Sequence, residues 1–357
     1  MLDRESSLRL NLLRFPLIIG VVFIHAYSST VGFSGGVVGI SQPNFIADFV
    51  RNFLSHGVAR IAVPLFFLMS GYLFFAGFKW SIESYLAKLK SRTKTLLIPF
   101  LFWNVATLIV IAAAQTIPAT KNFFSSNSQL VTTFSVFDYF NAITGFTRSP
   151  IAYQFWFIRD LIILVLLAPV INVVIRFAPL PFLGLVLFCW MIGGWSVTAP
   201  SPEALLFFSL GAYFGLKKMS LFYLDAFGPM IAGLYLVVVI IDAITINHPL
   251  NPYLHKIGIV LGIFAALFST KLAVQNEKLK LSIMQLSGAS FFVFAVHELL
   301  LTILRKMSYK ILLPESPFTI LFLYFLIPTI TITFAVVVYR GLTRVTPRFV
   351  GIVTGGR

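Results

Sequence analysis

Long apolar stretches separated by short polar connections run along the whole chain. About 20 mostly apolar residues suffice for a helix to cross the hydrocarbon core of a membrane. Ten segments fit, at about Leu10–Ser29, Phe53–Phe75, Leu96–Ile117, Phe155–Phe177, Pro181–Val197, Ala204–Leu216, Phe227–Ile246, Ile257–Val274, Ile283–Leu304 and Phe318–Tyr339. The sixth is short, and only Thr198–Pro202 separates it from the fifth. The pattern predicts an all-α, polytopic transmembrane bundle with about ten spans in a single domain over residues 1–357.

The composition supports a membrane protein and excludes several other classes. Hydrophobic residues make up 58% of the chain and charged residues 11%, against roughly 45–50% and about 25% in soluble domains. Such a chain cannot cover a water-facing surface, so it is not a soluble enzyme, a disordered protein or a small secreted domain. The single cysteine, Cys189, excludes an intramolecular disulfide and a cysteine metal cluster. Standard metal or nucleotide-phosphate motifs do not stand out, and we expect no metal.

The net charge of +15 bears on membrane topology rather than on nucleic acid. No block of Lys and Arg is interleaved with solvent-facing aromatic residues, so we expect no nucleic-acid partner. If the N-terminus is inside, most basic residues between spans lie on the cytoplasmic side, including a predicted basic, amphipathic interfacial helix at Lys79–Lys94. We therefore expect both termini in the cytoplasm. Arg305, Lys306 and Lys310 are exceptions, because they fall on the outer side.

Two ionisable residues in the first predicted span are candidates for a functional site. Ionisable side chains within spans cost roughly 3 kcal/mol each on insertion scales and usually face a cavity or a partner. Arg14 and His25 are about three helical turns and roughly 16 Å apart, so they lie on nearly the same face. Arg14 also lies close enough to the inner boundary for its guanidinium to reach the headgroups, as a simple topology anchor would.

The second and ninth predicted spans carry further polar residues. Arg60 requires an anion, a carboxylate or backbone carbonyls as its partner within a span. Ser70 and Gly71 suit either close helix packing or contact with a ligand. His297 and Glu298 fall within the ninth span. This content of Arg and His is typical of a catalytic or transport cavity, since histidine acts as a base near neutral pH and arginine suits phosphate or carboxylate.

The fourth predicted span contains Trp156, Arg159 and Asp160. Neighbouring residues on a helix point about 100° apart, so Arg159 and Asp160 need not pair with each other. We expect each to pair across helices, for instance Asp160 with Arg14 or Arg60.

Five sequence blocks follow one another in a familiar order. They are Arg14 and His25 with ten residues between them, Val63–Tyr72 (VPLFFLMSGY), Tyr85–Phe100 with its LLIPF ending, Phe155–Leu161 (FWFIRDL) and Ser290–His297 (SFFVFAVH). Together they cover nearly the whole chain and resemble the acyltransferase-3 family of integral membrane acyltransferases. Tyr72 departs from the family's pattern, in which Phe is common at this position.

The resemblance implies transfer of an acyl group, usually acetyl and sometimes succinyl, from acyl-CoA to a hydroxyl. The implied partners are acyl-CoA as donor substrate, an acceptor glycan or lipid-linked sugar, the lipid bilayer and a polysaccharide biosynthesis complex. The implied location is the bacterial plasma (inner) membrane, and no permanently bound cofactor is expected. No hydrophilic extension follows the tenth segment, so we expect the stand-alone type, without an SGNH domain.

The resemblance also assigns expected roles to the polar residues. His25 is expected to act as the general base for the acceptor hydroxyl or to carry the acyl group covalently, with Arg14 in the same catalytic centre. The residues expected to bind substrate are Arg60, Ser70, Gly71, Trp156, Arg159, Asp160 and His297. The residues expected to hold the phosphates of acyl-CoA at the cytoplasmic mouth are Lys88, Lys90, Arg92 and Lys94.

Two other functions are compatible with the same residues. A transporter or flippase of an anionic or glycosylated lipid would also use buried arginines, although no internal repeat is evident. A structural partner of a polysaccharide synthase is the other alternative. Release of free thiol from acetyl-CoA by the purified protein separates the enzyme from both.

Overall fold

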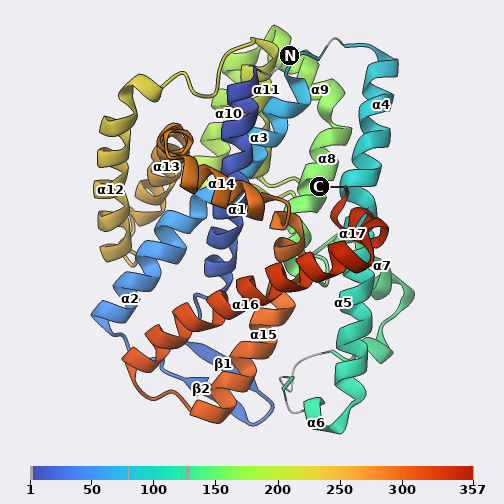
Figure 1. The fold of residues 1–357 in the computed structure, drawn as a ribbon, viewed down its shortest axis with the longest axis vertical. Coiled ribbons are helices and arrows are strands. Elements are labelled where there is room, and N and C mark those ends of the chain that lie inside the picture. The colour runs from blue at the N-terminus through green and yellow to red at the C-terminus, as the bar shows by residue number, and fades with distance from the viewer. Residues whose placement is uncertain (1–2, 79, 122, 125–128, 357) are drawn as a thin grey trace.

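The computed structural model describes residues 3–78, 80–121, 123–124 and 129–356, and most of these residues are helical (Figure 1). The helices of the first half are α1 Arg4–His25, α2 Phe45–Arg51, η1 Asn52–Val58, η2 Ala59–Ile61, α3 Ala62–Phe75, α4 Ile82–Arg92, η3 Thr93–Leu97, α5 Ile98–Thr116, α6 Pro118–Lys121, η4 Val131–Thr133, α7 Val136–Thr144, η5 Tyr153–Phe155, α8 Trp156–Leu166 and α9 Ala168–Phe177. Those of the second half are α10 Pro179–Ile192, α11 Pro202–Leu216, η6 Asp225–Phe227, α12 Gly228–Ile244, α13 Asn251–Gln275, α14 Glu277–Ser287, α15 Ser290–Leu312, α16 Pro317–Val345 and α17 Pro347–Thr354. The strands β1 Thr30–Phe33 and β2 Gly36–Gly39 form an antiparallel hairpin, with Thr30 opposite Gly39.

The described helices confirm a multi-pass membrane protein but not the number of ten spans. Six continuous helices are long and apolar enough to cross a membrane. Two bent pairs, α8 with α9 at 64° and α14 with α15 at 66°, raise the number to eight if each pair is one span. The fifth and sixth predicted segments correspond to α10 and α11, which are shorter apolar helices. The predicted apolar segments are therefore helical, but length and bending separate several of them from ordinary spans.

The predicted interfacial helix at Lys79–Lys94 is part of a longer helix. Lys79 itself lies outside the described residues. From Ile82 the chain runs through α4 and the π-helical η3 directly into α5, forming one continuous helix of 35 residues. No Gly or Pro occurs between Ile82 and Ile98 to end α4. The basic face of α4 is thus rigidly attached to a membrane-spanning helix.

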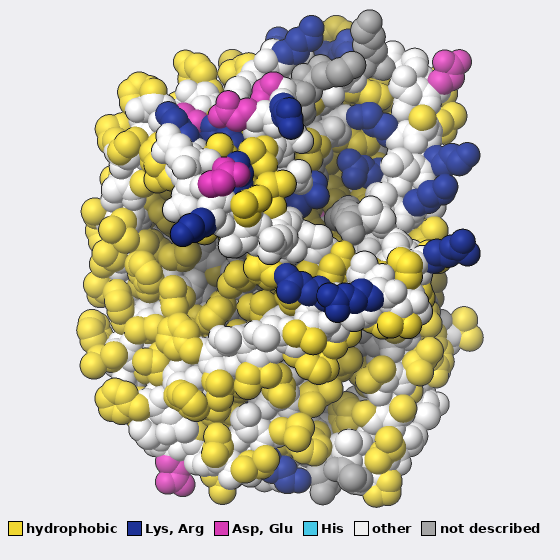
Figure 2. All heavy atoms as spheres, in the orientation of Figure 1, with side chains coloured by type: hydrophobic (Ala, Val, Ile, Leu, Met, Phe, Trp, Pro, Cys, Tyr) yellow, Lys and Arg dark blue, Asp and Glu magenta, His cyan; other side chains and the backbone are white. Residues whose placement is uncertain are grey.

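Helix α1 lies at the centre of the bundle and contacts α3, α13, α14, α15 and α16. Its start is capped by Asp3, whose Oδ1 accepts a hydrogen bond from the Ser6 amide at 2.6 Å. The hydrogen bonds from Ser6 hold the pKa of the Asp3 carboxyl below its usual value. Lys and Arg side chains gather over the end of the molecule where α1 begins, whereas the other half of this face is mostly hydrophobic (Figure 2).

Glycine allows α3 and α11 to pack backbone against backbone. A Cβ atom on Gly71 would lie 2.0 Å from the carbonyl oxygen of Phe208, and one on Gly211 would lie 2.1 Å from that of Leu68. Such small residues permit close helix approach within a membrane. Ser70 and Gly71 were expected to serve either close helix packing or contact with a ligand. The structure supports packing for Gly71.

Candidate active site

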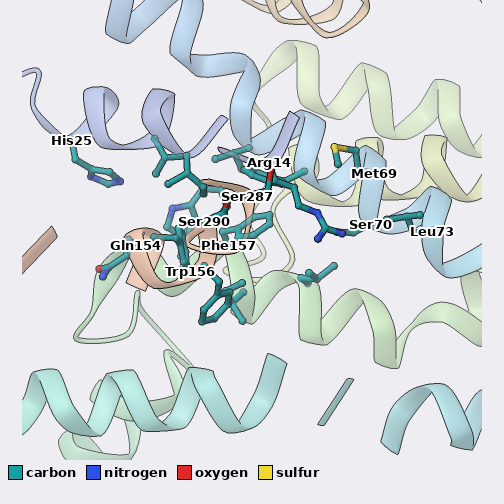
Figure 3. Close-up of a pocket in the computed structure, with 18 of the residues that line it drawn as sticks. Arg14, His25, Met69, Ser70, Leu73, Gln154, Trp156, Phe157, Ser287 and Ser290 are labelled. Carbon is teal, nitrogen blue, oxygen red and sulfur yellow. The ribbon is translucent and has the colours of Figure 1, made fainter. Parts of the chain in front are cut away.

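A pocket lies between α1, α3, α8 and α15, and it brings together residues that are far apart in the sequence. Its lining includes Arg14, His25, Ser70, Arg92 and Trp156, with mostly apolar side chains between them. His25 lies at one end of the pocket, and Arg14 lies toward the other end beside Ser70 (Figure 3). The predicted common face of Arg14 and His25 is confirmed, because both side chains line this one pocket.

His25 is the last residue of α1 and faces three groups from other elements. Its Nδ1 is 2.6 Å from the Tyr153 hydroxyl and 3.5 Å from Oε2 of Glu298. Its backbone carbonyl accepts a hydrogen bond of 3.4 Å from Arg305. When Nδ1 carries the proton, it donates to the Tyr153 hydroxyl, and the lone pair on Nε2 is left free to act as a base.

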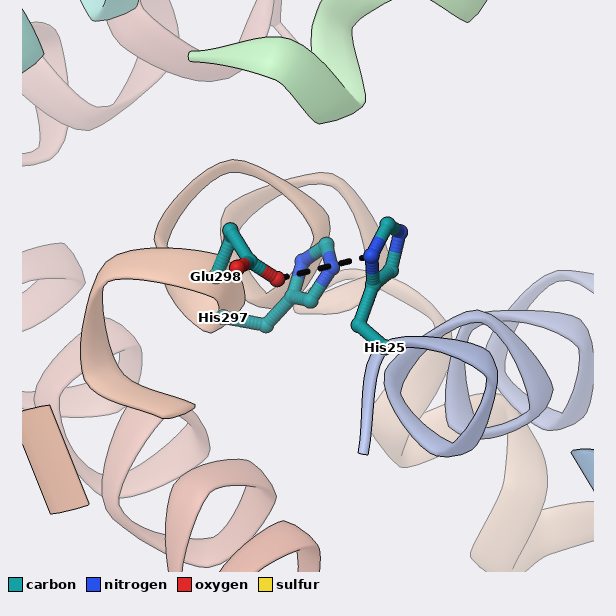
Figure 4. Close-up of side chains that lie close together, drawn as sticks. All are labelled: His25, His297 and Glu298. Atoms are coloured by element: carbon teal, nitrogen blue, oxygen red, sulfur yellow. Dashed lines mark ion pairs between the residues drawn. The ribbon is translucent and has the colours of Figure 1, made fainter. Parts of the chain in front are cut away.

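His297 and Glu298 come from α15 and complete this end of the site (Figure 4). The rings of His25 and His297 have centroids 5.1 Å apart. His297 is fully buried, and its Nδ1 lies 2.7 Å from the carbonyl of Phe294, which leaves Nε2 without a hydrogen-bond partner among the described residues. The Thr302 hydroxyl donates to Oε1 of Glu298 at 3.2 Å. Two imidazoles and a carboxylate therefore meet where α1 ends.

The opposite end of the pocket is positively charged. Arg14 and Arg92 both line it, and neither forms an ion pair with any described residue. The hydroxyl of Ser290, also in the lining, is buried without a hydrogen-bond partner in the described part of the chain. Both guanidinium groups are therefore suited to bind phosphate or carboxylate oxygens of a ligand in this pocket.

The structure places Arg60 beside the pocket rather than in its lining. Arg60 lies in the short helix η2, is exposed, and forms no ion pair with a described residue. Helix η2 contacts α1, whose residues Arg14 and His25 line the pocket.

The expectation that Asp160 pairs with Arg14 or Arg60 is wrong. Asp160 accepts hydrogen bonds from Arg159, at 2.9 Å and 3.1 Å, and from the Ser201 amide at 2.8 Å. Arg159 also donates to the carbonyls of Gly145 and Arg148 at 2.9 Å and 3.1 Å. The guanidinium is long enough to fold back onto its neighbour despite the 100° separation of the two side chains. This buried pair ties two loops to α8, and neither residue lines the pocket.

Of the four basic residues expected to bind CoA phosphates, the structure brings only Arg92 into the pocket lining. Lys88 donates to the carbonyl of Phe74, and its ammonium lies 4.6 Å from the centre of the Phe74 ring and 4.5 Å from that of Phe78. Lys90 and Lys94 are exposed. The three lysines therefore flank the pocket without lining it.

Sequence reasoning missed Tyr153, the role of Glu298 and a second polar cluster. In that cluster, the His255 ring stacks on His56 with centroids 4.0 Å apart, and its Nδ1 is 2.9 Å from Oδ2 of Asp242. A signal existed for both carboxylates, since each is an acidic residue within a predicted span. The sequence held no such signal for Tyr153, because this residue precedes the predicted span Phe155–Phe177 and is one of twelve tyrosines in the chain.

Two groups of side chains could hold a divalent metal ion. Each brings three potential ligand atoms within 4.8 Å of one another, and they are His25, His297 and Glu298, and His56, Asp242 and His255. In the second group His255 Nδ1 lies within hydrogen-bond distance of Asp242, at 2.9 Å, which is also the arrangement of a base and the carboxylate that orients it. In the first group His25 Nδ1 lies 3.5 Å from Glu298.

Comparison with known proteins found a matching family and a similar curated protein. Residues 7–340 match the family described as an acyltransferase domain. The succinoglycan biosynthesis protein ExoH of Rhizobium meliloti (strain 1021) is 27% identical over an alignment of 385 positions, which covers 100% of this chain and 94% of that protein. No solved structure gives a significant match.

Proposed function

The chain belongs to the acyltransferase-3 family and is an acyltransferase, and from this premise we propose that it is a membrane O-acyltransferase acting on a cell-surface glycan. The acyl group is acetyl or another short acyl group, and the donor is acyl-CoA. The observation that carries the proposal is the single pocket with His25 beside Glu298 at one end and two unpaired arginines at the other.

In the proposed reaction His25 acts as a general base. Nε2 takes the proton of the acceptor hydroxyl while the hydroxyl oxygen attacks the thioester carbon. The new C–O bond forms, the C–S bond breaks, and the CoA thiolate leaves and takes up the proton. Tyr153 holds the imidazole through Nδ1, and the Glu298 carboxylate, 3.5 Å from the same atom, favours the charged ring as it takes up the proton. A covalent acyl-histidine is the alternative route for the same residue.

The donor is proposed to bind at the Arg14 end. Arg14 and Arg92 are unpaired cations in the lining, and the lysines of α4 increase the positive charge outside it. Guanidinium groups bind phosphate oxygens in pairs, which suits the phosphates of CoA. This end corresponds to the cytoplasmic side of the bacterial inner membrane, with both termini in the cytoplasm. The acceptor then reaches His25 from the outer side.

The acceptor is proposed to be a polysaccharide or its lipid-linked precursor, and the group that is acylated is a sugar hydroxyl. Support comes from the similarity to a protein of succinoglycan biosynthesis. The test is compositional analysis of surface glycans from cells with and without the gene. We expect O-acyl esters to be lost with the gene and restored with it. Unchanged ester content in cells lacking the gene contradicts the proposed acceptor.

Replacing either Arg14 or Arg60 with lysine is expected to lower acyl transfer at least roughly tenfold, or about 1.4 kcal/mol of transition-state binding. A lysine keeps the charge but loses the planar, two-pronged donor geometry of arginine. The measurement is the transfer rate of each purified variant. Arg348→Lys, in an exposed position of α17, is the matched control and should be neutral. A silent Arg14→Lys variant means that Arg14 is only a topology anchor.

A further inference from the structure

The cluster of His56, Asp242 and His255, which we call the His-Asp-His cluster, has no part in the proposed reaction. None of its three residues belongs to the described lining of the pocket. They come from three elements, η1, α12 and α13. The two imidazole rings stack with centroids 4.0 Å apart, and Nδ1 of His255 is 2.9 Å from Oδ2 of Asp242. The fold thus gathers two histidines and a carboxylate at a second place.

One nitrogen of the His-Asp-His cluster lacks a partner. Nε2 of His56 is buried and makes no hydrogen bond with any residue that the structure describes. Burial takes such an atom out of water without replacing its hydrogen bond, so a buried polar atom of this kind usually has a bound ion or an ordered water as its partner. The contact between His255 and Asp242 satisfies those two side chains but leaves His56 Nε2 unsatisfied.

The carboxylate of the cluster is held in a fixed orientation by Asn251. The Asn251 amide donates to Oδ1 of Asp242 at 2.8 Å and to the backbone carbonyl of the same residue at 2.9 Å. Oδ2 is left facing His255. The side chains of Asp242 and His255 are 3% and 16% exposed, so the carboxylate is buried while the cluster stays accessible at His255. A hydrogen bond to the far oxygen of a carboxylate is the usual support of a metal ligand.

The backbone around His56 allows η1 to lie close to α12. Element η1 is π-helical, and π-helical turns are frequent at functional sites. A Cβ atom on Gly57 would lie 2.1 Å from Cγ2 of Val239, so glycine permits the close approach. Asn52, also in η1, donates to the carbonyl of Ala243 at 3.2 Å. These contacts explain how His56 comes to lie against residues far from it in the sequence.

The ligand set of the cluster matches a divalent transition-metal ion. It offers two imidazole nitrogens and one carboxylate oxygen, all within 4.8 Å of one another. Zinc–ligand bonds of about 2.0–2.2 Å place the ligand atoms of a tetrahedral ion roughly 3.4 Å apart, so small side-chain rotations are enough to enclose the ion. Imidazole suits zinc, whereas calcium and magnesium prefer oxygen ligands alone. The expectation of no metal rested on standard motifs, and tertiary contacts bring these ligands together without one.

We propose that the His-Asp-His cluster binds one zinc ion through Nε2 of His56, Oδ2 of Asp242 and Nδ1 of His255. Three protein ligands leave a fourth position, which a water molecule takes. The ion joins η1 to α12 and α13, two helices that η1 contacts directly. This proposal concerns a site outside the pocket and does not rest on the proposed function.

A zinc ion at this place stabilises an element that supports the end of α1. The Ser55 hydroxyl of η1 donates to the carbonyl of Phe23 at 2.6 Å, two residues before His25. The same hydroxyl lies 2.7 Å from that of Tyr324 on α16. Fixing η1 therefore also restrains its contacts with α1 and α16, and zinc should raise the temperature of thermal unfolding.

The test measures zinc binding by the purified full-length chain in detergent, treated with a chelator and carrying an affinity tag without histidine. Zinc is added alone, without acyl donor or acceptor. Bound metal is measured by inductively coupled plasma mass spectrometry, and the affinity by competition with a chelating dye. We expect one zinc ion per chain. Loss of a supporting residue alone weakens metal binding roughly 10–100-fold, so Asn251→Ala should fall in this range and His56→Ala should weaken binding at least roughly 100-fold.

The matched control is His248→Ala, because this exposed histidine lies in the connection between α12 and α13, beside the cluster in the sequence. It should bind zinc as tightly as the unmodified protein, and so should His25→Ala. If His56→Ala does not fold, Asp242→Asn serves, since its Oδ1 can still accept from Asn251.

Cobalt in place of zinc gives a second readout, the intense visible absorption of a four-coordinate site, which should be absent from the His56→Ala or Asp242→Asn variant. A chain that binds no zinc overturns the proposal. So does zinc binding that survives both substitutions, because the ion is then bound elsewhere. Zinc binding that is lost in His25→Ala but kept in His56→Ala also overturns it and assigns the metal to the other group of ligands.

Discussion

Replacing His25 with alanine is expected to lower acyl transfer by at least about 100-fold, the lower end of what a general base contributes. His25 is the one histidine in the described lining of the pocket, since His297 is not part of that lining and has its Nδ1 at the Phe294 carbonyl. The protein should still fold, since His25 is the last residue of α1 and its side chain remains partly exposed. The measurement is the rate of transfer by the purified variant, together with its thermal unfolding.

The control for His25→Ala is His248→Ala. His248 is an exposed histidine, and its contact is a local one with the Leu250 amide at 3.2 Å. The His248→Ala variant should transfer acyl groups at the normal rate. The transfer rate of Glu298→Gln should lie between those of His25→Ala and His248→Ala, because the amide keeps the shape of the side chain but not its charge. Near-normal transfer by a well-folded His25→Ala variant excludes His25 as the base.

The largest effect on stability is expected from Asp160→Ala, which should lower the free energy of unfolding by about 3–5 kcal/mol. The change leaves the buried Arg159 guanidinium with carbonyl partners alone and removes the acceptor for the Ser201 amide. Thermal unfolding in detergent measures it. Glu277→Ala is the control, since that exposed carboxylate pairs only with Lys280.

Variants of Asp160 also decide whether this residue has a structural role or binds substrate. If Asp160 is structural, removing both charges with Arg159→Met and Asp160→Leu should be less damaging than Asp160→Ala alone, because no unpaired charge stays buried. A variant of normal stability that has lost acyl transfer supports the substrate-binding role expected from the sequence.

The positions of the apolar helices, and the helix face shared by Arg14 and His25, could be predicted from the sequence. Hydrophobic length determines where helices form in a membrane, and helical periodicity determines which residues share a face. Neither determines how far a long side chain bends. Arg159 folds back onto Asp160 for this reason, and the periodicity of α8 gave no indication of it.

Tertiary contacts account for most of what the sequence did not predict. Tyr153 reaches His25 across 128 positions of sequence, and Glu298 reaches it from α15. Gly71 was expected to contact substrate, yet its missing side chain is what allows α11 to approach α3. The bends at 64° and 66° depend on how neighbouring helices pack, so counting apolar residues overestimated the number of ordinary spans.

Release of free thiol from acetyl-CoA by the purified protein tests the central claim most directly. The assay supplies surface glycan from cells lacking the gene as acceptor and compares the unmodified protein with His25→Ala and His248→Ala. We predict acceptor-dependent thiol release by the unmodified protein and by His248→Ala, and its loss in His25→Ala. A folded, unmodified protein that binds the acceptor but releases no thiol contradicts the account, as a transporter of an anionic or glycosylated lipid would behave in this way.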